Sequence, residues 1–288
     1  MIKTEPRASK AERLFAHAIL IFASLIALYP VSWVLKMALS PGRTFGTSAS
    51  PIPEAVTLEH FQRVVSTTAQ DGSWLFGRQL LNSVIVSGAT TVVGVFLATT
   101  AAYAFSRFRF PGRDRLLSTF LVTQMFPSTM VMIPLYVILD RLHLLDTWTG
   151  LVMVYSTTAL PFCVFMLKGY FDTIPTELEE AALIDGASRA QIFWTVIVPL
   201  ARPAIAVTAL FSFMTAWNEF ILAATFMATD AGYTLPVVLK SYIGGKAAST
   251  DWPAFAAGAT LVSIPVMALF FALEKHIVSG LTAGGVKG

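Results

Sequence analysis

The sequence TELEEAALIDGASRAQIFWTVIVPLARP, residues 176–203, predicts two short helices in succession. Thr176 is followed three residues later by Glu179, and Ser188 is followed three residues later by Gln191. This is the spacing of a capping box, in which a hydroxyl oxygen and an acidic or amide side chain bond the first free backbone N–H groups of a helix. Each pair therefore marks the start of one helix.

Gly186 lies between the two predicted helices and suits the left-handed conformation that ends a helix. The second helix shows apolar residues at helical spacing, namely Phe193, Val196, Ile197 and Leu200. Residues 172–203 are thus expected to form an elbow of two helices outside the membrane. Two roles remain open for it: docking on another protein, or lying on the lipid surface, which favours more Lys and Arg than its acidic first half carries.

On both sides of this elbow the chain is strongly apolar. Of its 288 residues, 55% are apolar and 13% are charged, whereas soluble domains carry about 25% charged residues. A membrane-spanning helix needs about 20 mainly apolar residues. Six stretches satisfy this requirement: 14–35, 80–106, 116–139, 151–170, 204–228 and 254–273. The predicted fold class is therefore an all-α membrane protein with six transmembrane helices.

Six spans place both chain ends on one side of the membrane. If that side is the cytoplasm, it holds 13 of the 20 lysine and arginine residues, four of them in the short loop after the second span. Both termini are therefore expected to be cytoplasmic. Residues 1–13 and 274–288 would then be tails flanking a six-helix domain, 14–273.

Small residues recur every four positions in the second span, at Gly94, Ala98 and Ala102. Such a stripe allows another helix to approach closely. It predicts helix packing rather than a ligand site.

The sequence lacks the motifs that are typical of several other functional classes. The nearest match to a phosphate-binding loop, Gly245-Lys246, is followed by Ala247 instead of Ser or Thr. The four histidines are isolated, and neither H-E-x-x-H nor G-x-S-x-G occurs, so an enzyme is not expected. The single Cys163 excludes an internal disulfide, and no basic block suggests nucleic acid.

Four polar side chains within the predicted spans are candidates for lining a polar pathway. Amides and carboxylates are the groups that hold hydroxyl-rich ligands. These residues are Asn82, Gln124, Asn218 and Glu219. A structural hydrogen bond between helices is the equal alternative for Glu219, because a carboxylate at membrane depth needs water or a donor.

The segment EAALIDGA, residues 180–187, resembles the EAA loop of bacterial ABC-importer permeases. Further segments resemble the carbohydrate branch of that family, in its maltose-type, MalG-like form. They are AYAFSR at 102–107, FPG at 110–112, MFP at 125–127, KGYFD at 168–172, WNEF at 217–220 and the tail GLTAGGVKG at 280–288.

The resemblance implies the ABC type I importer permease fold in the bacterial cytoplasmic (inner) membrane, in contact with membrane lipid. It implies a homologous permease subunit, a dimer of cytoplasmic ATPase subunits that binds the ATP and Mg, and an extracytoplasmic sugar-binding protein as partners. No cofactor is expected in this chain. The implied ATPase-coupling residues are Glu180, Ala181, Ala182, Asp185, Gly186 and Ala187, and the implied C-terminal ATPase contacts are Gly284, Gly285, Val286 and Lys287.

The function that follows from the resemblance is passage of a di- or oligosaccharide, such as maltose, maltodextrin or trehalose. Two alternatives remain open. One is a permease of the same architecture for another solute, such as a polyol or glycerol phosphate. The other is a membrane scaffold that transports nothing.

Overall fold

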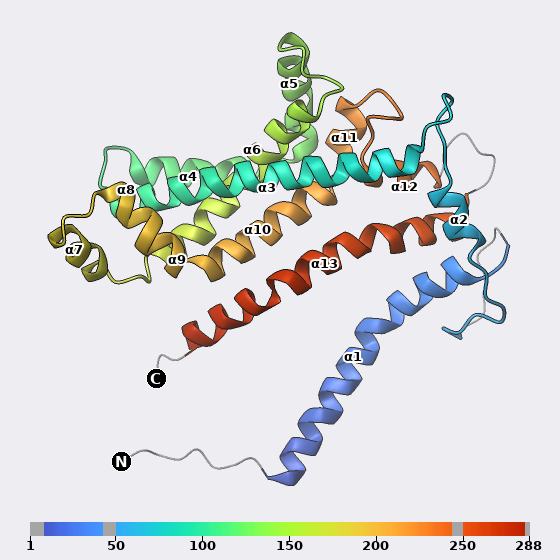
Figure 1. Ribbon diagram of the computed structural model, residues 1–288, viewed down its shortest axis with the longest axis horizontal. Coiled ribbons are helices and arrows are strands. Elements are labelled where there is room, and N and C mark those ends of the chain that lie inside the picture. Colours follow the sequence, from blue (N-terminus) through green and yellow to red (C-terminus); the bar gives the residue numbers. More distant parts are fainter. Residues whose placement is uncertain (1–8, 43–49, 244–249, 286–288) are drawn as a thin grey trace. The chain divides into compact units, whose positions relative to one another are not determined.

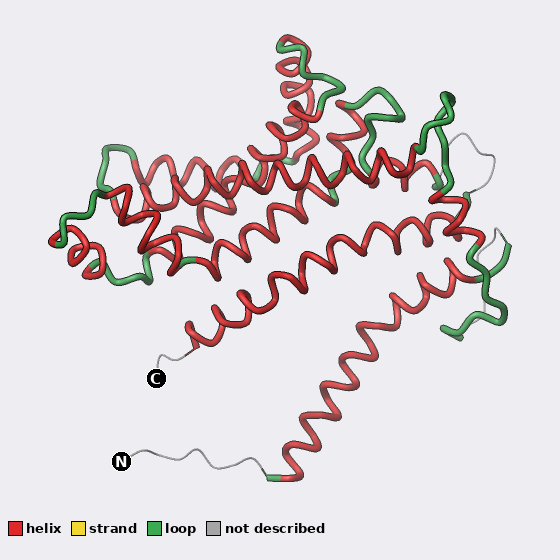
Figure 2. Tube along the Cα trace, viewed as in Figure 1, coloured by secondary structure: helices red, strands yellow, loops and turns green. Residues whose placement is uncertain are grey.

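A computed structural model describes residues 9–42, 50–243 and 250–285, and apart from one isolated bridge between Thr68 and Trp74 its regular elements are helices (Figures 1 and 2). They are α1 (Lys10–Leu39), α2 (Glu59–Val65), α3 (Leu75–Arg107), α4 (Arg113–Gln124), α5 (Ser128–Arg141), α6 (Trp148–Phe171), α7 (Glu177–Ile184), α8 (Arg189–Ile192), the π-helical turn η1 (Phe193–Ile197), α9 (Val198–Leu200), α10 (Arg202–Trp217), α11 (Ile221–Phe226), α12 (Leu235–Ser241) and α13 (Trp252–Gly285).

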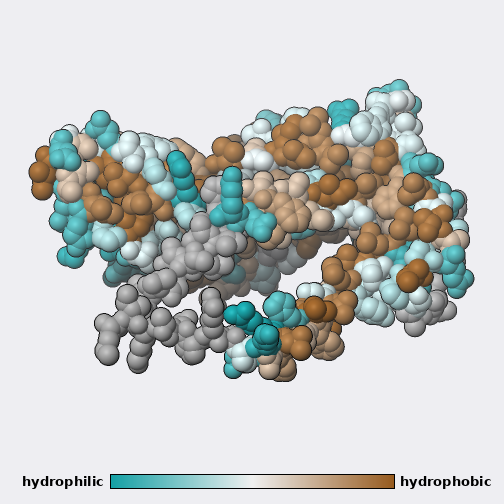
Figure 3. Space-filling view, turned by 60° about the horizontal axis from the view of Figure 1, so that its bottom comes forward, coloured by the Kyte–Doolittle hydropathy of each residue, from teal (hydrophilic) through white to brown (hydrophobic). Residues whose placement is uncertain are grey.

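Four helices are long and apolar enough to cross a membrane: α1, α3, α6 and the Trp252–Lys275 part of α13. The predicted spans 14–35, 80–106, 151–170 and 254–273 lie inside them, so their helical structure is confirmed. Many of their apolar side chains are exposed, and Figure 3 shows apolar residues, in brown, over much of the visible surface. Such a surface suits lipid rather than water.

The third predicted span, 116–139, is divided into two helices. The chain forms α4 and α5, which are bent sharply relative to each other at Met125–Pro127. Pro127 has no N–H for a helical hydrogen bond and disfavours helical conformation in the residue before it. The break therefore follows from this proline.

The fifth predicted span, 204–228, is also interrupted. α10 ends at Trp217 and α11 begins at Ile221. The 16 residues of α10 rise about 24 Å, which is less than the ~30 Å hydrocarbon core of a bilayer. The structure accordingly supports between four and six spans, six only if each bent helix pair crosses as one.

By their internal contacts the residues form two compact units. One comprises residues 1–67 and 239–262, which include α1, α2 and the start of α13. In its described part, the Arg63 guanidinium pairs with the Asp251 carboxylate at 2.6 Å. A ring nitrogen of the fully buried His60 lies 3.0 Å from the Ser40 carbonyl oxygen. These contacts hold α2 to the end of α1 and to the start of α13.

The other unit comprises residues 68–238 and 263–288, and α3 packs along α6 and α10 within it. The predicted small-residue stripe is buried: Ala98 and Ala102 have no exposed surface. A Cβ added at Gly94 would lie 3.3 Å from Ser212 Oγ on α10. Close packing at this stripe is therefore confirmed.

Candidate functional site

The elbow lies at one end of the α3–α6–α10 bundle and begins with α7 (Figure 1). Gly186 has φ +87°, as predicted for a residue that ends a helix. Its N–H bonds the Leu183 carbonyl at 3.0 Å, and the Ala187 N–H bonds the Ala182 carbonyl at 3.0 Å. These two bonds form a complete Schellman motif, which satisfies the last carbonyls of α7 and turns the chain toward α8.

The second helix of the elbow begins at the predicted capping box. The Gln191 N–H donates to Ser188 Oγ at 3.3 Å, and the Ser188 N–H donates to Gln191 Oε1 at 2.8 Å. The helix then widens into η1, where the Val198 N–H bonds the Phe193 carbonyl. Because Pro199 has no N–H to continue the α-helical pattern, a π-helical turn fits just before it.

The first predicted capping box, at Thr176, is wrong. Thr176 has helical torsion angles, φ −69° and ψ −22°, and its side chain makes no cap bond. A capping residue requires a non-helical backbone. Glu179, the other half of the predicted box, points instead toward α3.

Glu179 forms a buried ion pair that the sequence interpretation missed. Arg107 Nε donates to Glu179 Oε1, and the Tyr103 hydroxyl donates to Glu179 Oε2 at 2.9 Å. The side chains of Arg107 and Glu179 are only 9% and 11% exposed. The available signal was the four-residue spacing of Tyr103 and Arg107, which places both on one helix face.

The predicted coupling residues divide into an exposed and a packed set. Glu180, Ala181, Asp185 and Gly186 are exposed, whereas Ala182 and Ala187 are half-buried against the core beneath. At the tip, the Ile184 side chain is 87% exposed. This exposed isoleucine, on a short acidic helix, presents an apolar contact surface.

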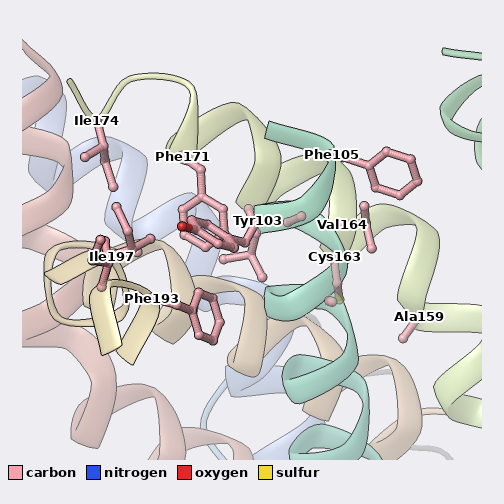
Figure 4. Close-up of a cluster of buried hydrophobic side chains, with 14 residues drawn as sticks. Tyr103, Phe105, Ala159, Cys163, Val164, Phe171, Ile174, Phe193 and Ile197 are labelled. Atoms are coloured by element: carbon pink, nitrogen blue, oxygen red, sulfur yellow. The ribbon is translucent and has the colours of Figure 1, made fainter. Parts of the chain in front are cut away.

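Beneath the elbow lies a cluster of buried apolar side chains, shown in Figure 4. Tyr103 of α3 contributes one ring, 4.9 Å from the ring of Phe193 and 6.4 Å from that of Phe171. Ile192 and Ile197 of the second elbow helix are also buried there. The elbow is thus packed onto the ends of α3 and α6 rather than tethered by a loose loop.

Glu219 lies at the break between α10 and α11. Its carboxylate accepts from the Leu222 N–H at 2.8 Å and the Ala223 N–H at 2.9 Å, both in the first turn of α11. It also accepts from the Tyr155 hydroxyl of α6 at 2.8 Å. This geometry favours the structural alternative for Glu219, because the carboxylate caps one helix and joins it to another.

The other three pathway candidates donate hydrogen bonds to backbone carbonyls. Asn82 is buried and donates to the carbonyls of Ala231 and Tyr233 at 2.8 and 3.0 Å. Gln124 donates to the Thr158 carbonyl at 3.0 Å, and Asn218 to the Met214 carbonyl at 2.9 Å. A pathway role for the four residues stays a prediction.

Gly284 and Gly285 of the predicted C-terminal contact lie in the last turn of α13. Val286 and Lys287 lie outside the described residues. Within the part of the chain that the structure describes, no group of three or more His, Cys, Asp or Glu side chains is placed to hold a metal ion.

Residues 91–282 match the family described as binding-protein-dependent transport system inner membrane component. This segment contains about half of α3 and the whole elbow.

Relatives of known transport systems are similar over nearly the full chain. The galactooligosaccharides transport system permease protein GanQ of Bacillus subtilis (strain 168) is 38% identical, with 96% of this chain and 95% of the relative covered. The trehalose transport system permease protein SugB of Mycobacterium tuberculosis is 38% identical, covering 91% and 93%. The maltose/maltodextrin permease protein MalG of Salmonella typhimurium is 36% identical over the full length of both chains.

Among solved structures, a chain of a bacterial ABC transporter involved in the import of the acidic polysaccharide alginate matches with a TM-score of 0.74. It is 25% identical, and 94% of this chain and 99% of that chain are covered. A chain of the MetNI methionine ABC transporter matches at 17% identity with a TM-score of 0.57, a likeness of fold alone. This chain belongs to the family of inner membrane components of binding-protein-dependent transport systems.

Proposed function

We propose that this chain is a translocating permease subunit of an ABC importer for a di- or oligosaccharide. The similarity to galactooligosaccharide, trehalose and maltodextrin permeases over more than nine-tenths of the chain supports the sugar class. The exposed elbow supports the coupling role, and it is the observation on which the proposal depends. Ile184 and its acidic neighbours on α7 form the surface that enters a partner.

The proposed partners are those typical of ABC importers. A second permease completes the pathway, an extracytoplasmic binding protein delivers the sugar, and two ATPase subunits bind ATP and Mg and dock on the elbow. This chain contributes six spans with both termini in the cytoplasm, the bent pairs each crossing once. It carries no cofactor of its own.

The mechanism is mechanical. Closure of the ATPase pair displaces the elbow, and the spans joined to it tilt so that the cavity opens alternately to the two sides. Residues 172–176 join α6 to α7, and Ala201 joins α9 to α10, so a displacement of the elbow acts on both α6 and α10.

The test of substrate class begins with the binding protein encoded beside this chain. Calorimetric titration with di- and oligosaccharides, a polyol and glycerol phosphate identifies its ligand. Uptake of that ligand into proteoliposomes holding the four-component system then reports transport. Sugar uptake that requires ATP supports the proposal, whereas selective uptake of the polyol or glycerol phosphate contradicts the sugar class.

A separate test asks whether ATP hydrolysis belongs to the ATPase subunits and not to this chain. This chain purified alone is expected to hydrolyse no ATP, and hydrolysis is expected to appear when the ATPase subunits are added. Hydrolysis by the rigorously separated chain contradicts the proposal.

A further inference from the structure

Arg107, the last residue of α3, holds the elbow at two points. Its Nε donates to the Glu179 carboxylate on α7, and its Nη2 donates to the Ile174 carbonyl, in the segment before α7, at 2.9 Å. Tyr103, one turn earlier on α3, donates to the same carboxylate at 2.9 Å. We call Tyr103, Arg107 and Glu179 the inner clamp.

The inner clamp is nearly closed to solvent. With 9% and 11% of the side chains of Arg107 and Glu179 exposed, the attraction between their charges is screened far less than in a surface pair. Removing either partner leaves the other charge buried and unpaired. A displacement of α7 is therefore opposed unless α3 moves with it.

A second connection reinforces the same end of α3. Ser106 Oγ donates to Asp172 Oδ1 at 2.6 Å, and Lys168 Nζ donates to Asp172 Oδ2 at 2.6 Å. Partial burial raises the pKa of Asp172, but the hydrogen bonds from Lys168 and Ser106 together outweigh it and hold the pKa below its usual value, so the carboxylate stays charged at neutral pH. α3, the end of α6 and α7 are thus joined at one place.

The opposite end of α3 carries a matching set of polar contacts. Gln79 Nε2 donates to the Asp230 carbonyl at 2.9 Å, and Asn82 donates to the carbonyls of Ala231 and Tyr233. The Leu235 N–H donates to Ser83 Oγ at 2.7 Å. We call Gln79, Asn82 and Ser83 the outer clamp, since it holds the loop 229–235 after α11, which the proposed topology places outside.

One unbroken helix joins the two clamps. α3 has 33 residues and contains no proline, so it extends about 50 Å. It packs along α6 and α10 through small residues, which brings the helices close together. A packed helix of this kind moves as a rigid body rather than absorbing a displacement at one end.

We propose that α3 transmits displacement of the coupling elbow to the outer loop 229–235, with Arg107 and Glu179 as positioning residues at the inner clamp and Gln79 and Asn82 at the outer clamp. This inference rests on the proposed transport function. ATP-driven movement of α7 then shifts the loop that follows the α10–α11 break, on the opposite side of the membrane.

Hydrogen exchange of the assembled transporter tests the transmission. The complete complex, containing this chain, the second permease and the ATPase subunits, is compared with and without ATP and vanadate, which hold the ATPase pair closed. Wild type is expected to change its exchange at both 177–184 and 229–235. In Glu179→Gln the change at 177–184 persists, whereas the change at 229–235 falls at least about fivefold, the lower end of usual coupling factors.

Glu177→Gln is the matched control, because Glu177 lies on the same helix and is exposed. It is expected to behave as wild type at 229–235. Arg107→Lys keeps the positive charge beside Glu179. Its ammonium group lacks the planar, forked geometry of guanidinium, so it is not expected to bond the Ile174 carbonyl at the same time. It is expected to give an intermediate loss, and it decides the question if Glu179→Gln fails to assemble.

A wild-type response at 229–235 in both Glu179→Gln and Arg107→Lys overturns the role of α3. An equal loss in Glu177→Gln also overturns it, since removal of any negative charge from α7 would then produce the same effect. Sugar uptake per ATP, measured on the same preparations in proteoliposomes with the binding protein, separates the two proposals. A wild-type complex that couples 177–184 to 229–235 but takes up no sugar contradicts the transport function and not the transmission.

Discussion

Gly186 and Glu219 each hold a change of chain direction, and they do so by different means. Gly186 is required for its backbone conformation, φ +87°, and not for space, because an added Cβ would meet no atom within 4 Å. Glu219 works through its charge, accepting three hydrogen bonds at the start of α11. Substitutions at the two positions are therefore expected to destabilise the protein for different reasons. At Gly186 the backbone becomes strained, whereas at Glu219 three hydrogen-bond donors lose their acceptor.

Gly186→Val is expected to weaken ATPase docking and to uncouple hydrolysis from transport. A side chain in the left-handed conformation costs about 1–2 kcal/mol, and a β-branched one is the most strained. Gly186→Asn is the matched control, since asparagine tolerates this region. Pull-down of the ATPase and sugar uptake in the same preparations measure the effect. Equal values for wild type and the valine variant contradict the role of the elbow in docking.

Tyr155→Phe is expected to lower the free energy of unfolding by about 1–2 kcal/mol, because it removes the hydroxyl that donates to Glu219 and leaves the ring. Thermal or denaturant unfolding in detergent micelles measures this change. Tyr136→Phe serves as the control. Tyr136 is 42% exposed, so loss of its hydroxyl is expected to change the free energy of unfolding little. In the Glu219→Gln background the effect of Tyr155→Phe is expected to shrink, and additive effects are evidence against the bond between them.

Among the elements, the two helices of the elbow illustrate what a local pattern predicts. The Ser188 box and the Gly186 turn were predictable because each depends only on residues three to five positions apart. The Thr176 box fails because Glu179 has a partner 72 positions away, and spacing carries no information about such a contact. The break at Asn218 was missed for a related reason, since hydropathy averages over the carboxylate that starts a new helix.

Ser188→Ala and Thr176→Ala should therefore differ, although both remove a hydroxyl before a short helix. Ser188→Ala is expected to destabilise the start of α8 by about 0.5–2 kcal/mol, whereas Thr176→Ala leaves α7 unchanged within error. Hydrogen exchange of the backbone amides in residues 177–192 resolves the two helices. Faster exchange of α7 in Thr176→Ala, with α8 unaffected in Ser188→Ala, reverses the expectation.

For the whole molecule, composition and the distribution of basic residues supported a membrane protein and an orientation, and family membership supports the first. Which helices touch was beyond the sequence, apart from the stripe at Gly94, Ala98 and Ala102. Polar residues in the spans were expected to line a pathway, but Asn82 and Glu219 bond the chain's own backbone. The chemistry of a polar residue alone does not show whether it lines a pathway or bonds a neighbouring helix.

The orientation predicts which side of the membrane reaches each loop. A cysteine introduced at exposed Ile184 is expected to react with an impermeant maleimide only after cells are permeabilised, and one at exposed Asp71 in intact cells. The native Cys163 is fully buried, so it gives a low background. Chains expressed without the ATPase leave Ile184 uncovered. Labelling of Ile184→Cys in intact cells contradicts cytoplasmic termini.

The widened turn η1 constrains how the length of this segment varies. A π-helical turn holds one more residue than the α-helical turn that it replaces. Deleting one residue from Phe193–Ile197 converts this turn into an α-helical one that still completes a full turn, so the facing of the preceding residues changes little relative to α9. Ile192, now 1% exposed, then still faces the cluster beneath the elbow. A deletion inside the regular helix α10 rotates everything before it by about 100°, so a single-codon deletion is better tolerated in η1 than there.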